Sequence, residues 1–408
     1  MRTFLSTVLA WLTGPRMQRF VFAVLRRFAP VLVIGKRVLI TQHADVLDVL
    51  KRDEDFTIKK INAPRLDGIQ VHFILGMDRS LEYDREEALL ESVVLKKDLD
   101  RIQKFARVTA DGLIEAASTQ GRIDVVTGLA RVVPMRLIEN YFGVPSPNDQ
   151  TMMHWMRILF QEIFLNFSND PEVHETALRA ATELKHHIEM AIVETKARSA
   201  DGISRDNETV LSRLLAVQKQ NSNWPDDDTV RRSISGLMLG SAETTSKAFT
   251  HVIDELLSRP DQLRGAVAAA TLGGVEMVGR YAFEALRFDP VSPVLLRYCP
   301  RETLLGAGEV HKRTIPANST VAVSPLSAMF DPSVFEKPSH FDADRKSNYL
   351  HFGYGMHTCF GRWIVGVEVP ELVMAILKLK NLRRAPGSEG RIVYEGAFPD
   401  RLILEFDP

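Results

Sequence analysis

The segment of residues 351–361 constrains this chain more than any other part of the sequence. It reads HFGYGMHTCFG and holds three glycines and Cys359, one of two cysteines in the chain. Because glycine has no Cβ, such a loop lets its backbone approach a flat ligand closely. A long apolar run to Leu379 follows, and a helix that begins just after Cys359 would aim backbone N–H groups at the sulfur. Those donors stabilise a thiolate, so the segment predicts a cysteine that acts as an anion.

Other interpretations of Cys359 are weaker. A lone cysteine is most often a buried structural thiol. A zinc site would need two ligands at usable spacing in addition to His357 and Cys359, and the sequence does not offer them. Cys299 and Cys359 are also too few for a disulfide framework, which fits a reducing cytosol.

The run FGYGMHTCFG resembles the cysteine-loop signature of the cytochrome P450 superfamily. The matching positions are Phe352, Gly353, Gly355, His357, Cys359 and Gly361. The resemblance implies a mainly helical α+β fold with a long central oxygen-binding helix, small sheets at the chain ends and a cysteine loop under haem b. It also implies that Cys359 is the thiolate ligand of the iron, with electron density that promotes cleavage of the O–O bond. Phe352, Gly353 and Gly361 would then belong to the haem-binding loop.

Upstream of this loop, Glu284 and Arg287 lie at i,i+3 spacing in a helix predicted to end at Pro290. Such a pair is usually a solvated surface bridge. In this context it resembles the family's Glu-x-x-Arg pair, which holds the core beneath the haem together with a later arginine. Residues 341–345 resemble that later segment, so Arg345 is the candidate partner. We predict a structural role for all three side chains.

Residues 240–245, GSAETT, resemble the acid–threonine element of the family's oxygen-binding helix. Splitting dioxygen requires protons, and a threonine hydroxyl with a nearby carboxylate can relay them through water. The resemblance therefore makes Glu243 and Thr244 the candidate catalytic residues. A Thr244 hydroxyl bonded back to a carbonyl near Gly240 would open the helix and leave room for dioxygen. Ser241 departs from the family's more usual glycine, and without the cysteine loop a small-residue packing face would be the favoured interpretation.

Haem propionates need cationic or hydroxyl donors, and arginine is the strongest option. By the resemblance, His357 and Arg297 take this role. The family commonly shows His-x-x-x-Arg near the start of a helix where this chain has a different sequence after Gly76, and Tyr83 and Arg85 are the candidate substitutes. By the same analogy the substrate pocket is lined by Leu237, Gly240, Ser241, Val294, Leu295 and Phe398, which suit a lipid, terpenoid or aromatic molecule.

Apolar periodicity elsewhere predicts mainly helices. They are expected at residues 41–51, 84–117, 150–164, 171–198 and 227–258, with one more that ends at Pro290. Strand-like segments at 31–40, 313–323 and 391–406 predict one sheet assembled from remote pieces, and hence the α+β class. We predict a single haem-binding domain over residues 29–408, preceded by an amphipathic segment over residues 1–28.

The apolar part of residues 1–28 is too short to span a bilayer. A helix packed on the body is the favoured interpretation, with peripheral membrane contact as the alternative. A formal net charge of −1 gives no reason to expect a nucleic acid partner. We therefore expect a cytoplasmic protein with at most peripheral membrane contact through residues 1–28.

The resemblance implies a monooxygenase that inserts one atom of dioxygen into a small apolar substrate. Electrons would come from a separate ferredoxin or flavodoxin and its reductase, since no flavin or iron–sulfur segment is fused to the chain. An isomerase or dehydratase of hydroperoxides with the same fold is the alternative, although Glu243 and Thr244 count against it. A non-catalytic haem or ligand-binding protein is favoured least, because that pair would be idle in it.

Overall fold

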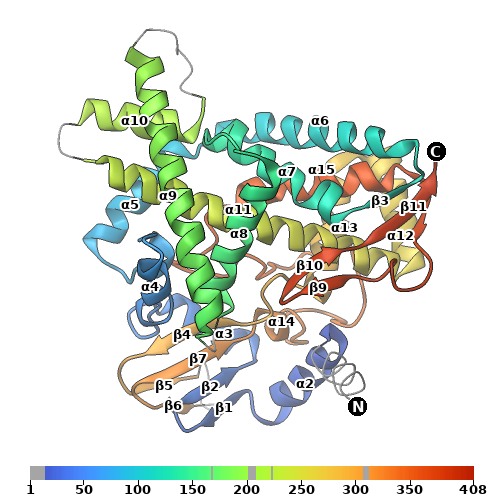
Figure 1. Ribbon diagram of the computed structural model, residues 1–408. Coiled ribbons are helices and arrows are strands. Elements are labelled where there is room, and N and C mark those ends of the chain that lie inside the picture. Colours follow the sequence, from blue (N-terminus) through green and yellow to red (C-terminus); the bar gives the residue numbers. More distant parts are fainter. Residues whose placement is uncertain (1–13, 167–168, 201–207, 222–223, 307–311) are drawn as a thin grey trace. The chain divides into compact units, whose positions relative to one another are not determined.

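The computed structural model describes residues 14–166, 169–200, 208–221, 224–306 and 312–408 (Figure 1). Its helices are α2 (Pro15–Phe28), α3 (His43–Lys51), α4 (Lys59–Gly68), α5 (Leu81–Val93), α6 (Leu99–Ser118), α7 (Val132–Leu137), α8 (Asp149–Phe164), α9 (Pro171–Ala200), α10 (Val210–Gln220), α11 (Asp227–Leu257), α12 (Pro260–Ala268), α13 (Gly274–Phe288), α14 (Pro325–Ala328) and α15 (Arg362–Leu377). Its strands are β1 (Val31–Ile34), β2 (Arg37–Ile40), β3 (Arg122–Asp124), β4 (Leu295–Cys299), β5 (Thr303–Leu305), β6 (Arg313–Ile315), β7 (Ser319–Val323), β8 (Lys380–Arg384), β9 (Val393–Glu395), β10 (Phe398–Arg401) and β11 (Ile403–Asp407).

The chain divides into two compact units. The first consists of Met1–Ile61 and Arg280–Phe360, and the second of Asn62–Gly279 and Gly361–Pro408. Each unit is therefore built from two segments that are remote in the sequence.

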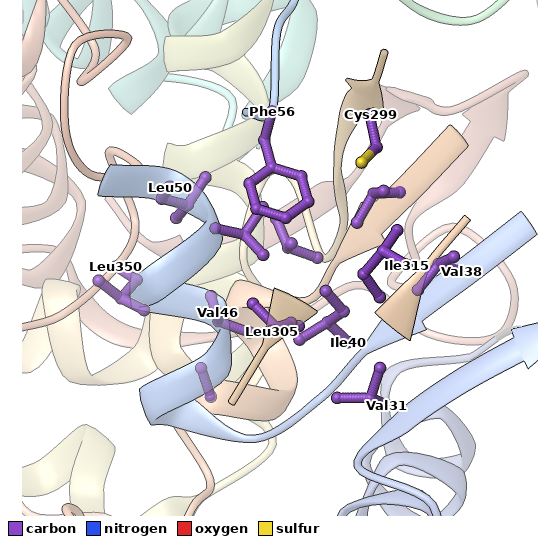
Figure 2. Packing of buried hydrophobic residues seen from close by; sticks show 14 of the residues in the cluster. Val31, Val38, Ile40, Val46, Leu50, Phe56, Cys299, Leu305, Ile315 and Leu350 are labelled. Carbon is purple, nitrogen blue, oxygen red and sulfur yellow. The ribbon is translucent and has the colours of Figure 1, made fainter. Parts of the chain in front are cut away.

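The first unit contains a four-stranded sheet in the order β1-β2-β7-β4 and the small β5-β6 sheet. A turn at Gly35, whose φ is 59°, joins β1 to β2 in an antiparallel hairpin. Strand β2 then pairs in parallel with β7, so that Val38 lies opposite Val321. Figure 2 shows Leu50 and Phe56 packed with strand residues such as Ile40 in one apolar core. This core links residues near the start of the chain to residues near its end.

The second unit is organised around α11. Asp226 caps this helix by accepting a hydrogen bond from the backbone N–H of Thr229. Helices α8, α9 and α15 all pack against α11, and α15 also packs extensively on α6. Residues 233–239 are buried, but the next residue, Gly240, is exposed. The middle of α11 therefore has a turn that solvent-sized molecules can reach.

The mainly helical α+β class is confirmed, and most predicted helices are present. The single helix predicted over residues 84–117 is wrong, because α5 ends at Val93 and α6 begins at Leu99. Between them the carboxylate of buried Asp98 accepts hydrogen bonds from Tyr141 and Arg213. These long-range bonds fix the break, and no periodicity of the local sequence records them.

The prediction of one sheet is also wrong, because the described strands form four sheets. Residues 313–323 contain a turn at Asn318, whose φ is 60°, so β6 and β7 belong to different sheets. Strands β3, β4, β5 and β8 were not predicted, since each has only three to five residues. The prediction of a single domain over 29–408 stays a prediction.

The predicted N-terminal helix begins at Pro15, and the apolar residues before it lie outside the described part of the chain. Within that part, no helix combines the length and apolar character that crossing a bilayer requires.

Candidate active site

The cysteine loop is a tight backbone turn. The N–H of Cys359 donates a 2.8 Å hydrogen bond to the carbonyl of Phe352, which closes the loop. Gly353 and Gly355 have φ values of 69° and 76°, in the left-handed region that favours glycine. A Cβ on Gly355 would also lie 2.2 Å from the carbonyl oxygen of Leu50. The loop therefore depends on glycine for both its conformation and its packing.

The two cysteines differ in accessibility. Cys299 is fully buried, and its Sγ–H donates to the carbonyl of Arg301 at 2.9 Å. Burial raises the pKa of the Cys299 thiol, which suits a structural role. Cys359 is partly exposed, and α15 begins three residues later at Arg362. Among the described residues no group of three or more His, Cys, Asp or Glu side chains is placed to hold a metal ion, so zinc gains no support.

Glu284, Arg287 and Arg345 meet in the first unit. Glu284 and Arg287 are completely buried and form a two-pronged ion pair at 2.9 and 2.8 Å. Arg345 approaches the same carboxylate at 3.4 Å, and the Tyr349 hydroxyl donates to it at 2.8 Å. Arg287 also donates to three backbone carbonyls, those of Met329, Pro338 and His340. The cluster thus joins helix α13 to the segment that precedes the cysteine loop.

The environment of Arg297 bears on whether this chain can bind a haem. Its side chain is nine-tenths buried on β4, and burial lowers its pKa to about 10. It donates to the carbonyl of Leu296, but no carboxylate of the described chain pairs with it. A buried cation without a counter-ion is costly, and an anionic ligand would remove that cost. The glycine loop before Cys359 suits a flat ligand, and Arg297 suits a ligand that carries carboxylates.

The other predicted propionate ligands are less clear. Arg85 lies over the ring of Trp224 at 3.7 Å, and Tyr83 donates to Glu87 at 2.8 Å. Both residues thus have partners within the second unit, and their role as propionate ligands stays a prediction. His357 is partly exposed and lies in the same unit as Arg297 and Cys359.

The acid–threonine element lies in the middle of α11. The Thr244 hydroxyl donates a 2.6 Å hydrogen bond to the carbonyl of Gly240, as the sequence predicted. A Cβ on Gly240 would meet no atom within 4 Å, so the space beside it is open. Ser241 donates to the carbonyl of Met238 at 2.9 Å, which directs its hydroxyl back to the helix. The predicted opening of the helix is wrong, because α11 stays continuous through this turn and the open space lies beside it.

Glu243 has a different environment from Thr244. It is 3% exposed, and burial raises its pKa despite the nearby cations Arg131 and Arg157. The Nε of Arg131 lies 3.8 Å from Oε1 of Glu243. The sequence did not predict a role for either arginine, because no local motif places them near α11. A buried carboxyl that binds a proton readily is suited to acid catalysis.

The predicted pocket residues fall in both units. Leu237 and Phe398 are buried, whereas Ser241 is half-buried and Gly240 exposed, all in the second unit. Val294 and Leu295 are half-buried in the first unit. Their joint role as a substrate pocket stays a prediction.

Comparisons with known proteins agree with these features. The family profile described as Cytochrome P450 matches residues 38–396. Cytochrome P450 monooxygenase PikC of Streptomyces venezuelae is 30% identical over 72% of this chain, which spans 64% of that relative's length. The steroid C26-monooxygenase of Mycolicibacterium smegmatis is 26% identical over 85% of this chain and 81% of its own. The crystal structure of CalO2 superimposes with a TM-score of 0.81 over 96% of both chains at 21% identity, which shows a shared fold.

Proposed function

The chain belongs to the cytochrome P450 family, whose members bind haem through a cysteine thiolate, and from that premise we propose that it inserts one atom of dioxygen into a small apolar organic molecule. The observation that carries this proposal is the glycine-shaped loop that ends at partly exposed Cys359. Buried Arg297 supports it, because it lacks an anionic partner among the described residues.

We assign the haem-binding roles to residues of the first unit. Cys359 would ligate the iron, and Arg297 with His357 would hold the propionates by charge-assisted hydrogen bonds. A structural role is proposed for Glu284, Arg287 and Arg345, and their burial supports it. When bound, the haem supplies the activation of dioxygen, and the protein supplies orientation and protons.

Proton delivery is assigned to α11. The Thr244 hydroxyl uses its hydrogen to bond Gly240, so its oxygen is left to accept a hydrogen bond from water in the open space there. Glu243 keeps a proton at a pH where an exposed glutamate has lost it, because burial raises its pKa. Together they can hold a proton and pass it on through water. This pair disfavours a hydroperoxide isomerase, which needs no such delivery.

The substrate is proposed to be a lipid, terpenoid or aromatic compound. Buried apolar side chains at Leu237 and Phe398 support an apolar ligand. One relative is named as a steroid C26-monooxygenase, which agrees with this class of substrate. Electrons are proposed to come from a separate ferredoxin or flavodoxin with its reductase, and basic residues such as Arg362 offer a docking site for an acidic carrier.

The test is the absorption spectrum of the haem-loaded protein, reduced with dithionite and exposed to carbon monoxide. We expect a strongly red-shifted Soret band that is lost in Cys359→Ser. Cys299→Ser is the matched control and should keep the band, since Cys299 is a buried structural thiol. Bound haem without the shifted band, or a shifted band that survives Cys359→Ser, would overturn the proposal.

The location is proposed to be cytoplasmic, with α2 in contact with an anionic lipid surface. Phe20, Val24 and Phe28 are 65%, 43% and 81% exposed, and their i,i+4,i+8 spacing forms one outward apolar stripe. Arg19 and Arg26 face the body, where they donate to the carbonyls of Phe288 and Ser327. Arg16 and Arg27 are exposed and residues 1–28 contain no acid, which complements anionic headgroups.

Co-sedimentation with phosphatidylglycerol vesicles tests this location. Binding should fall strongly in Phe20→Ser/Phe28→Ser, whereas Leu81→Ser, which changes an 88% exposed leucine elsewhere, should bind like the native protein. Equal binding of all three proteins would refute the lipid contact. A dimer that is lost only in the double variant would show that a second copy covers the stripe instead.

A further inference from the structure

Arg131 and Glu243 form an incomplete ion pair inside the second unit. Arg131 directly precedes α7, and its side chain and that of Glu243 are only 8% and 4% exposed. The 3.8 Å between Arg131 Nε and Glu243 Oε1 is too long for a hydrogen bond. Within the described chain this buried Nε has no hydrogen-bond partner. The cation is thus close enough to attract the carboxylate without fixing it.

The same arginine is also held by the β9–β10 hairpin. Its Nη2 donates to the carbonyl of Pro399 at 2.6 Å and lies 3.5 Å from Oδ1 of Asp400. Both distances are shorter than the 3.8 Å to Glu243. Arg131 is therefore shared between a buried acid on α11 and a partly exposed acid on the hairpin, and the hairpin has the closer contacts.

A second arginine extends the network to the surface. Arg157 on α8 lies 3.1 Å from Asp400 and 2.8 Å from Glu395 on β9. The side chains of Asp400 and Glu395 are 43% and 69% exposed. The contacts run in the order Glu243, Arg131, Asp400, Arg157 and Glu395. Two cations thus serve three carboxylates, and Glu243 is the carboxylate with the weakest contact.

The hairpin that competes for Arg131 also carries a predicted pocket residue. The ring of Phe398 packs edge-on against Phe160 at 5.4 Å, and the guanidinium of Arg157 lies 5.6 Å from its centre. A substrate that displaces Phe398 would move Pro399 and Asp400 along the same strand. Phe398 lies on the same strand as Pro399 and Asp400, the two residues that contact Arg131.

We propose that Arg131 and Asp400 are positioning residues for Glu243: Arg131 divides its charge between the buried acid and the hairpin, and displacement of the hairpin returns that charge to Glu243. The proposal deepens the proton-delivery role and rests on the proposed function. Glu243 then releases its proton more readily when a substrate occupies the pocket. The charged groups that act on Glu243 are Arg131, Arg157, Glu395 and Asp400, from the segment before α7 and from α8, β9 and β10.

The two positioning residues carry opposite charges, so their loss should shift the pKa of Glu243 in opposite directions. Loss of Arg131 removes an attraction for the ionised acid, so the pKa of Glu243 should rise further. Loss of the Asp400 charge removes a repulsion and frees Arg131, so this pKa should fall. A network whose charges do not act on Glu243 would not give opposite shifts.

Infrared titration of the haem-loaded protein tests the proposal directly. The protonated carboxyl band of Glu243 is identified by its loss in Glu243→Gln. We expect its titration midpoint to rise by about one pH unit or more in Arg131→Gln, to fall in Asp400→Asn, and to stay near the native value in Arg131→Lys. Arg122→Gln is the control, because it breaks only a surface pair with Glu389 in the same unit. Shifts of the same sign, or none, in folded Arg131→Gln and Asp400→Asn would overturn it.

The pH dependence of product formed per NADH consumed gives a second readout. The pH midpoint of this yield should rise in Arg131→Gln and fall in Asp400→Asn. A structural defect would instead lower the yield at every pH. If Arg131→Gln does not fold, Asp400→Asn alone carries the test, because Asp400 is partly exposed. The carbon monoxide spectrum separates the two proposals, since the infrared midpoints do not depend on whether Cys359 ligates iron.

Discussion

Gly355 shows at the scale of one residue how the cysteine loop is specified. Its φ of 76° strains any side chain, and an added Cβ would lie 2.2 Å from the Leu50 carbonyl oxygen. Gly387 has a similar φ of 69° but open space around an added Cβ. Gly387→Ala should therefore lower the free energy of unfolding only by the conformational cost of about 1–2 kcal/mol. Gly355→Ala should lower it clearly more. Unfolding in guanidinium measures both, and equal losses would mean that the backbone clash is relieved at no cost.

Replacement of Arg297 should have opposite effects on the protein with and without haem. Arg297→Met removes a buried charge that has no anionic partner among the described residues, so the apoprotein should gain stability of about 1–3 kcal/mol. The haem-loaded protein should lose haem roughly tenfold faster or more, because a charge-assisted hydrogen bond is lost. Thermal unfolding of the apoprotein and haem transfer to apomyoglobin measure the two effects. Arg301→Met, at a 74% exposed side chain, should change neither.

Local motifs made some site residues predictable and left others hidden. Thr244 and Gly240 are one helical turn apart, and Glu284 and Arg287 are three residues apart, so a short stretch of sequence contains each contact. Arg131 meets Glu243 only because α7 and α11 pack together, and no spacing in the sequence indicates that contact. Cys299 and Cys359 also differ in burial, since Cys299 is fully buried and Cys359 is partly exposed. The sequence alone does not reveal this difference.

At the scale of the element, α15 contains a second unusual acid. Glu368 is 2% exposed, and burial raises its pKa to about 8, while its Oε1 has no hydrogen-bond partner in the described chain. The unfolded chain releases this proton near pH 4.5 and the folded protein keeps it to about pH 8. Stability should therefore fall as pH rises through this window, by about 1.4 kcal/mol per pH unit.

Glu368→Gln should remove this dependence, so that its advantage over the native protein grows from pH 5 to pH 8. Denaturant unfolding at a series of pH values measures the slope. Glu139→Gln, at an exposed position in the same unit, should keep the native slope. A native slope in Glu368→Gln would show that Glu368 is ionised in the folded protein.

The ends of elements were harder to predict than their presence. Pro171 and Asp227 begin α9 and α11 as expected, because caps and prolines are local signals. The break between α5 and α6 depends instead on Tyr141 and Arg213, which bind Asp98 from elsewhere in the fold. The strand predicted over residues 31–40 is a hairpin of two strands, because Gly35 allows a sharp turn.

At the scale of the whole molecule, order in sequence and order in space differ. Strand β2 near the start of the chain pairs with β7 near its end, and β11 pairs with β3. The sequence predicted that remote pieces would share a sheet, but it did not contain the partners or the register. Pairing of this kind is decided by which apolar faces fit together, and short strands carry too few residues to specify that alone.

Ile40 tests how far this long-range pairing holds the first unit together. It is fully buried and lies opposite Val323, whereas Ile34 on the same hairpin is 66% exposed. Ile40→Ala should destabilise the protein by about 2–5 kcal/mol through the cavity it leaves, and Ile34→Ala by much less. Because β2 and β7 share hydrogen bonds, amide exchange should accelerate in 37–40 and in 319–323 together. Faster exchange confined to residues 31–40 would instead mean that β7 is held by β4 alone, and that the start of the chain adds no stability to the strands near its end.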